Sequence, residues 1–162
     1  MAHPVTSLKK EDVKPIPEGA VPIVRRVTKW MSRANVWVYR KTDGRIGGRF
    51  LGGAPVCLVT YTGRRSGKKL TTPLIHIPHG DGILLVASQG GLDKHPLWYL
   101  NMRANPDIEV NEFGTVRAMR ARQATPEEKL ALWPVARDVY PDFDEYQART
   151  DRDIPVMICT PT

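Results

Sequence analysis

Three apolar, β-branched segments lie close together between Pro55 and Ser88, and the short turns between them constrain the fold more than any other feature. The segments, whose composition predicts strands, are residues 55–62 (PVCLVTYT), 70–78 (LTTPLIHIP) and 83–88 (ILLVAS). The turns are GRRSGKK at 63–69 and HGDG at 79–82. A crossover between parallel strands needs a dozen or more residues, so these consecutive strands must run antiparallel.

The rest of the chain predicts further strands and helices. In chain order these are a short helix (96–106), a hairpin (107–122), a helix from Thr125, a second short helix (140–152) and a closing strand (154–160). Thr125 and Glu128 form a capping box that opens the third of these elements, and we expect Pro134 to interrupt it. The six strands predict an α+β fold, an antiparallel sheet closed or partly closed into a barrel.

The amino-terminal part predicts a tail followed by an amphipathic helix. Residues 1–22 carry four prolines and predict a flexible or loosely docked tail ahead of a single domain at 23–162. On a helix over residues 23–41, the cations Arg25, Arg26, Lys29, Arg33 and Arg40 share one face, opposite Val24, Val27, Trp30, Met31, Ala34 and Val38. Two interpretations remain open: a helix docked on its own core, or one that also touches an anionic membrane surface.

The same part of the chain bears on localisation. It has no signal-peptide hydrophobic region, and no apolar run approaches the roughly 20 residues of a spanning helix. We therefore expect a cytoplasmic protein, which would be peripheral on the inner face of the cell membrane if the helix binds there.

A cationic turn at residues 63–69, the cationic loop, is the most distinctive charged feature. The net charge is +7, which predicts an acidic partner, and Arg64, Arg65, Lys68 and Lys69 concentrate that charge around Gly63 and Gly67. The glycines permit a tight turn with converging N–H groups, and arginines fork onto phosphate oxygens. The loop is therefore either a phosphate site or an exposed hairpin tip without a ligand.

Other classes of function lack their signatures. The histidines at 3, 76, 79 and 95 lack metal-ligand spacing, and the common hydrolase and nucleotide motifs are missing. Nucleic-acid binding is not expected, because no RNP-like or helix-turn-helix signature accompanies the charge.

Several longer stretches carry a family resemblance. They are KWMSRANVWVYR (29–40), TGRRSGK (62–68), VASQGGLDKHPLWYLNMRANP (86–106), ATPEEKLALWP (124–134) and YPDFDEYQARTDRDIPV (140–156). In this order they resemble the deazaflavin-dependent nitroreductase family of actinobacteria, over about Val27 to Thr160. The resemblance implies an FMN-binding split-barrel-like fold and the cofactor coenzyme F420, an 8-hydroxy-5-deazaflavin with a phospholactyl-oligoglutamate tail.

The resemblance also implies site residues. Arg64, Arg65, Ser66 and Gly67 would hold the phosphodiester of the cofactor, and Lys68 and Lys69 would meet the carboxylates of its tail. The deazaflavin ring would be lined by Pro73, Leu74, Val86, Ala87, Ser88 and Gln89, with Leu97, Trp98, Tyr99 and Asn101 completing the pocket. Without the resemblance, Trp98 and Tyr99 are equally core or surface residues of a short helix, and Ser88 a turn residue.

The implied reaction is hydride transfer from C5 of the reduced deazaflavin to a quinone, an enone or a nitroaromatic compound. The candidates for donors to the acceptor oxygen are Ser88, Tyr140 and Tyr146. Relatives that activate nitroimidazoles carry tyrosines where this chain has Ile75 and Phe143, which predicts weak nitro reduction and favours quinones or α,β-unsaturated carbonyl compounds. The alternatives are a non-catalytic deazaflavin-binding or storage protein and an FMN-binding oxidoreductase of the same barrel.

Overall fold

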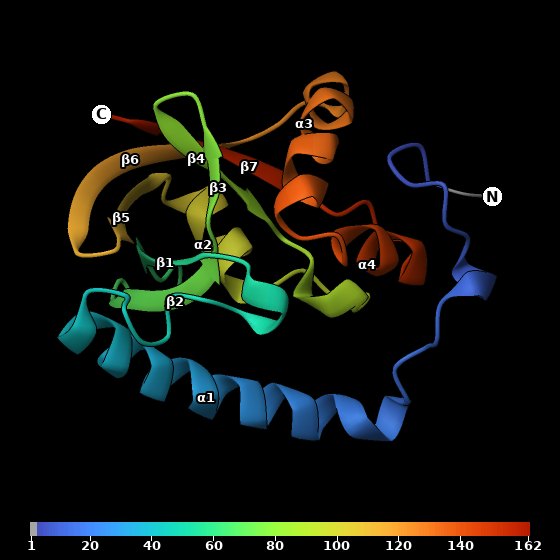
Figure 1. Ribbon diagram of the computed structural model, residues 1–162, viewed down its shortest axis with the longest axis horizontal. Coiled ribbons are helices and arrows are strands. Elements are labelled where there is room, and N and C mark those ends of the chain that lie inside the picture. The colour runs from blue at the N-terminus through green and yellow to red at the C-terminus, as the bar shows by residue number, and fades with distance from the viewer. Residues whose placement is uncertain (1–2) are drawn as a thin grey trace.

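The computed structural model describes residues 3–162, including the side chains of all of these except 18, 23–32 and 51. One antiparallel sheet is surrounded by four α-helices (Figure 1). The strands are β1 (Val56–Thr62), β2 (Lys69–Ile75), β3 (Ile77–His79), β4 (Gly82–Val86), β5 (Asp107–Glu112), β6 (Thr115–Gln123) and β7 (Val156–Pro161). The helices are α1 (Val21–Thr42), α2 (Leu97–Ala104), α3 (Pro126–Val139) and α4 (Phe143–Arg149).

The sheet closes on itself through one bent strand. Its strand order is β2-β1-β5-β6-β7-β4-β3, so β2 and β3 are its two edges. Only His76 separates these two edge strands in the sequence. The segment predicted as one strand at 70–78 is therefore two strands, because the chain bends at His76 and exchanges β1 for β4 as its partner. The result is the antiparallel barrel that the short turns predict.

The barrel opens beyond this bend. The ladder between β3 and β4 ends at the pair Ile77↔Leu84. Continued in the same register, it would place Ile75 opposite Val86 and Pro73 opposite Ser88, but among the described residues no ladder joins β2 to β4. We call the unpaired stretch between residues 73–75 and 86–88 the split. Residues 71–76 are all half-buried, as expected of a strand with one unpaired edge.

Alternate residues of the strands fill two sides of the sheet. One cluster, the barrel interior, collects the same face of β1, β4, β5, β6 and β7 with side chains of α2, including Val59, Leu85 and Met102. The opposite face of β4 and β7 packs under α3 and α4 around the buried Trp133. The two faces therefore support different helices, and among the described side chains α2 is the one helix that contributes to the barrel interior.

The carboxyl-terminal part of helix α1, whose side chains the structure describes, docks on β1. Val36 and the fully buried Tyr39 pack on Val56 and Leu58 of β1, and the Tyr39 hydroxyl accepts the Phe113 N–H at 2.9 Å. On the predicted apolar face, Ala34 is exposed and Val38 half-buried. The other four residues of that face, at 24, 27, 30 and 31, lie outside the described side chains, as do the predicted cations at 25, 26 and 29. Within residues 3–162, no helix is long and apolar enough to cross a membrane.

The predicted interruption of α3 is wrong. The helix runs without a break from Pro126 to Val139 and contains Pro134, while its predicted capping box of Thr125 and Glu128 is present. Proline removes the hydrogen bond to the carbonyl four residues earlier, that of Leu130. Leu130 and Pro134 are both exposed, so water can satisfy that carbonyl.

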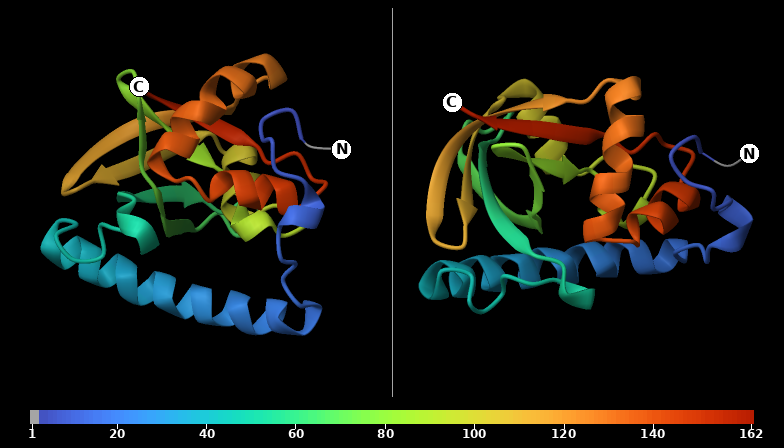
Figure 2. Two further views of the ribbon diagram at one scale, coloured as in Figure 1. Left: turned by 45° about the vertical axis from the view of Figure 1, so that its right-hand side comes forward. Right: turned by 45° about the horizontal axis from the view of Figure 1, so that its top comes forward.

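The amino-terminal segment lies beside α4 (Figure 2). Thr6 and Val13 are buried, Lys10 pairs with Asp151 at 2.7 Å, and the Arg149 guanidinium donates to the Lys14 carbonyl at 3.2 Å. Flexibility of residues 1–22 stays a prediction, and the described part of the segment contacts the domain.

Candidate active site

The cationic loop is a tight turn shaped by its two glycines. The Gly63 N–H donates to the Lys68 carbonyl and the Gly67 N–H to the Gly63 carbonyl, each at 2.8 Å. Gly67 has a φ of +66°, where other residues are strained. A Cβ at Gly63 would lie 2.6 Å from the Ser66 Oγ. The positive φ therefore favours glycine at residue 67, whereas a side chain at residue 63 would require Ser66 to move.

Helix α2 anchors the cationic loop. The Asn101 Oδ1 accepts the Arg64 N–H at 3.1 Å, and the Asn105 Nδ2 donates to the Thr62 carbonyl at 3.3 Å, just before the loop. Asn101 is 8% exposed, so this contact is largely shielded from water. Asn101, predicted as a pocket residue, thus also holds the backbone of the predicted phosphate site.

The charges of the cationic loop are not compensated. The side chains of Arg64, Arg65, Lys68 and Lys69 are exposed. Among the side chains that the structure describes, no carboxylate lies within ion-pair distance of them. The arginines of β6 contrast with this, since each one pairs with a carboxylate (Arg117 with Glu112, Arg120 with Asp107, Arg122 with Glu128). The loop therefore fits a phosphodiester and a polycarboxylate tail.

The residues predicted to line the deazaflavin ring border the split. Pro73 and Leu74 lie on its β2 side, and Val86, Ala87 and Ser88 on its β4 side. All five are half-buried except Ala87, which is fully buried. Gln89, which follows, is half-buried as well. The structure thus places the two predicted groups on the two sides of the split.

Leu97, Trp98 and Tyr99, also predicted as pocket residues, lie on α2. Trp98 and Tyr99 belong to the barrel interior and are 7% and 2% exposed, while Leu97 is exposed. The Tyr99 hydroxyl donates to the Gln123 Oε1 at 2.7 Å, and its ring lies 4.8 Å from that of His95. These contacts fit the interpretation of Trp98 and Tyr99 as core residues, and their contact with a cofactor stays a prediction.

The residues predicted to face the hydride acceptor, other than Ser88, lie in one apolar cluster with α3 and α4. They are Ile75, Tyr140, Phe143 and Tyr146. The Tyr140 and Tyr146 hydroxyls are 3.0 Å apart, and the Phe143 ring lies 5.1 Å from that of Tyr140. Ile75 is half-buried and packs against the same cluster, whereas Phe143 is only 2% exposed. Burial, together with the hydrogen bond to Tyr146, raises the pKa of the Tyr140 phenol above its ordinary value.

The third candidate donor, Ser88, lies in a loop packed against α4. We call residues 87–92 the Ser88 loop. A Cβ at Gly91 would lie 2.6 Å from the Tyr146 carbonyl, so the loop backbone directly contacts the helix that carries Tyr146. The Ser88 loop is therefore adjacent to α4, which carries Tyr146, the hydrogen-bond partner of Tyr140.

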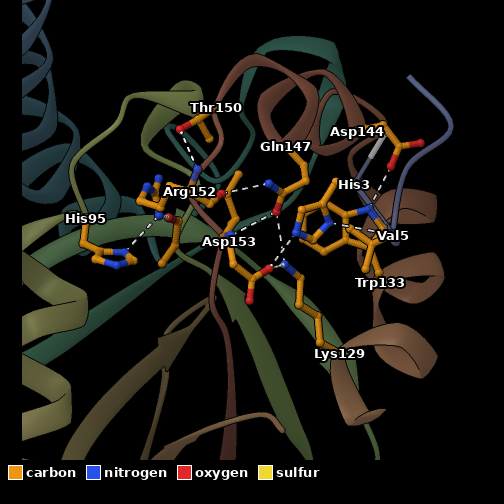
Figure 3. A network of polar contacts seen from close by, with 12 residues as sticks. His3, Val5, His95, Lys129, Trp133, Asp144, Gln147, Thr150, Arg152 and Asp153 are labelled. Atoms are coloured by element: carbon orange, nitrogen blue, oxygen red, sulfur yellow. Dashed lines mark hydrogen bonds and ion pairs between the residues drawn. The ribbon is translucent and has the colours of Figure 1, made fainter. Parts of the chain in front are cut away.

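Arg152 holds the Ser88 loop, and it was missed by sequence reasoning. Its guanidinium donates to the carbonyls of Ala87, Ser88 and Leu92 at 3.1, 2.9 and 3.1 Å. It also lies 2.9 Å from the His95 Nδ1 (Figure 3). Arginine is always a donor, so His95 must accept, and burial and nearby cations lower the His95 pKa accordingly. Arg152 lies in residues 140–156, one of the stretches that carry the family resemblance, but no local sequence pattern identifies it as a site residue.

Comparisons with known proteins agree with this geometry. The family described as F420H(2)-dependent quinone reductase matches residues 30–161. An F420H(2)-dependent quinone reductase of Mycobacterium tuberculosis is 36% identical over 139 residues, which are 84% of this chain and 93% of that protein.

Solved structures agree as well. One described as an F420-H2 dependent reductase has a TM-score of 0.62 and 42% identity, covering 65% of this chain and 94% of that chain. Another, described as a domain-swapped dimer, has a TM-score of 0.64 and 37% identity, covering 82% of this chain and 98% of that chain. The predicted split-barrel fold, F420 as cofactor and oxidoreductase class are confirmed, with the predicted nitroreductase family replaced by a more specific one. The chain belongs to the F420H(2)-dependent quinone reductase family.

Proposed function

We propose that this protein oxidises F420H(2) and reduces a quinone to its hydroquinone. The observation that carries the proposal is the cationic loop, which presents four exposed cations and whose backbone is held at Arg64 by Asn101. Bound F420H(2) supplies the hydride, and the protein contributes binding, orientation and electrostatics. Mycobacterial relatives named as F420H(2)-dependent quinone reductases support the choice of acceptor.

The binding residues would share two tasks. Arg64, Arg65 and Ser66, with the Gly67 backbone, would hold the phosphodiester, and Lys68 and Lys69 would pair with the tail carboxylates. Pro73 and Leu74 on one side of the split and residues 86–89 on the other would contact the ring. The apolar side chains of Pro73, Leu74, Val86 and Ala87 support a flat aromatic occupant and limit access of water.

Reduction of a quinone by a hydride leaves negative charge on one oxygen, which must then be protonated. Ser88, in the Ser88 loop, carries a hydroxyl that can donate to this oxygen. The Tyr140 and Tyr146 hydroxyls are hydrogen-bonded, so a proton can pass between them. Tyr140 is protonated at neutral pH, as any phenol is, and burial raises its pKa further, so the pair would hold a proton near the apolar cluster.

The choice among acceptors would follow from Ile75 and Phe143. Neither side chain carries a hydroxyl, and both pack in the cluster that contains the two tyrosines. A nitro group would lack donors at these two positions, whereas a quinone or an enone would pack its apolar body on them. We therefore propose weak reduction of nitro compounds beside the main activity.

A membrane surface is proposed as the second partner, through α1. The side chains of Arg33, Trp37 and Lys41 are exposed, and Trp37 is 65% exposed. Exposed tryptophan beside cations is typical of helices that lie on anionic bilayers. Such a location would bring the enzyme to lipid-soluble quinones.

A turnover screen tests the proposed function. Purified protein with F420H(2) is offered a menaquinone analogue, a cyclohexenone and a bicyclic nitroimidazole, and cofactor oxidation is followed by absorbance. We expect the quinone to be reduced fastest. Binding of F420 without quinone-dependent oxidation would favour a storage protein, and FMN affinity equal to that for F420 would favour an FMN enzyme.

A further inference from the structure

Arg152 contacts backbone carbonyls where an arginine more often finds a carboxylate. Its Nη1 donates to the Ala87 carbonyl, its Nη2 to the Ser88 carbonyl and its Nε to the Leu92 carbonyl. Within the described part of the chain, no carboxylate forms an ion pair with it. The described hydrogen bonds of this half-buried guanidinium are thus all with the Ser88 loop and with His95.

The position of Arg152 is itself fixed from behind. The fully buried Gln147 donates from Nε2 to the Arg152 carbonyl at 2.9 Å and accepts the Ile154 N–H at 2.9 Å. The buried Lys129 donates to the Gln147 Oε1 and pairs with Asp153 (Figure 3). The guanidinium therefore extends from a rigid segment toward the loop.

These contacts determine the direction of two N–H groups. The described part of the chain contains no cis peptide bond, so each N–H points away from the carbonyl of the preceding residue. The Ala87 and Ser88 carbonyls point to Arg152, and the N–H groups of Ser88 and Gln89 therefore point away from it. A second arginine, Arg149, binds the Gly90 carbonyl at 2.7 Å.

The clamped backbone is also in a costly conformation. Gln89 has a φ of +47°, a left-handed value that few residues other than glycine adopt. Such a conformation persists when its surroundings hold it, and it occurs most often at functional sites. The contacts of Arg152 and Arg149 to the carbonyls on either side of Gln89 provide that support.

We infer that Arg152 is a positioning residue, which aims the Ser88 N–H group at a carbonyl oxygen of a ring bound in the split. The inference rests on the proposed function, because a ring must bind there. A cation at the carbonyl of a peptide also polarises that peptide, which makes its N–H a stronger donor. The oxygen belongs either to the quinone or to the deazaflavin, and these two cases give different kinetics.

Two variants of Arg152 are compared with the wild type. Arg152→Lys keeps the charge but has a single donor centre, which cannot reach four acceptors at once. Arg152→Met removes charge and donors while keeping much of the apolar stem. The control is Arg120→Met, because Arg120 is an exposed arginine that pairs with Asp107 on β5, away from the Ser88 loop.

The first measurement needs no cofactor. Hydrogen exchange of residues 88–91 should accelerate in Arg152→Lys, while exchange in β5 and the melting temperature stay near those of the wild type. The second measurement is fluorescence titration with oxidised F420. The third is the single-turnover rate with a menaquinone analogue at saturating F420H(2).

The expected change is a loss of roughly 10–100-fold in Arg152→Met and a smaller loss in Arg152→Lys. If the oxygen belongs to the deazaflavin, the loss occurs in F420 affinity. If it belongs to the quinone, F420 affinity is kept and the single-turnover rate falls. The Arg120→Met variant should match the wild type in both.

The inference is overturned if Arg152→Lys matches the wild type in hydrogen exchange of residues 88–91, in F420 affinity and in single-turnover rate. It is also overturned if activity falls only in proportion to the unfolded fraction. If Arg152→Met does not fold, Arg152→Lys decides alone. A wild type that binds F420 but reduces no quinone contradicts the proposed function, while loop exchange and F420 affinity still decide the inference about Arg152.

Discussion

Replacing Asn101 with alanine tests whether α2 prepares the cationic loop for its ligand. The change removes the acceptor of the Arg64 N–H, a contact of 3.1 Å made by a residue that is 8% exposed. A hydrogen bond of this kind contributes about 1 kcal/mol net. If that energy is used to keep the loop in its binding conformation, F420 should bind about fivefold more weakly to Asn101→Ala.

The dependence of binding on salt separates this effect from a loss of charge. Asn101→Ala removes no charge, so the slope of log Kd against log salt should stay that of the wild type. The double variant Arg64→Ala with Arg65→Ala should have a smaller slope and a larger loss, since each charged hydrogen bond contributes about 1.5–3 kcal/mol. Fluorescence titrations with F420 at several KCl concentrations measure both quantities.

A matched control comes from the residue that caps the same helix. Asn105 donates to the Thr62 carbonyl at 3.3 Å, and none of its described hydrogen bonds reaches residues 63–69. Asn105→Ala should therefore bind F420 as the wild type does. Wild-type affinity in Asn101→Ala, or an equal loss in Asn105→Ala, would refute the idea that Asn101 orders the loop.

Three further predictions concern acidity, acceptor choice and membranes. Arg122 and the Thr125 N–H hold the pKa of Glu128 at about 2 in the folded protein, so the stability gained is complete above pH 4.5 and is lost as the pH falls toward 2. In thermal melts between pH 2 and 6, Glu128→Gln should therefore lose less stability on acidification than the wild type. The double variant Ile75→Tyr with Phe143→Tyr should gain turnover of a bicyclic nitroimidazole while quinone turnover falls, measured by F420H(2) oxidation; unchanged nitroimidazole turnover would contradict the proposed pocket. The wild type should co-sediment with anionic vesicles at low salt and release them at high salt, and absence of binding at low salt would leave α1 as a packing element.

Much of the fold could be predicted because its strands are joined by short turns. Apolar, β-branched runs and turn residues located the predicted strands, and the spacing of Thr125 and Glu128 located the capping box. The bend at His76 could not be located, since residues 70–78 form one apolar, β-branched run and alternation does not show where a strand changes partners. Pro134 failed as a helix breaker because Leu130, whose carbonyl loses its helical hydrogen bond, is an exposed residue, so water can bond to that carbonyl.

The candidate site divides in the same way. The cationic loop was predictable, because its glycines and cations are contiguous in the sequence. Arg152 was not, because its partners lie 57–65 residues away and its function depends on the meeting of two distant segments. On α1, helical periodicity ranked residues by hydrophobicity, whereas the docked face uses the hydroxyl of Tyr39 as well as its ring.

The single bent strand that forms both edges of the sheet bears on how the protein folds. In most barrels the first and last strands must find each other across a long stretch of chain, which costs loop-closure entropy. Here the two edges adjoin His76, so they are held together before any ladder forms. The entropy cost shifts to the pairing of β4 with β7, which joins Ile83 to Cys159. We therefore expect the hairpins of β1 with β2 and β3 with β4 to form early and the docking of β7 to limit the folding rate.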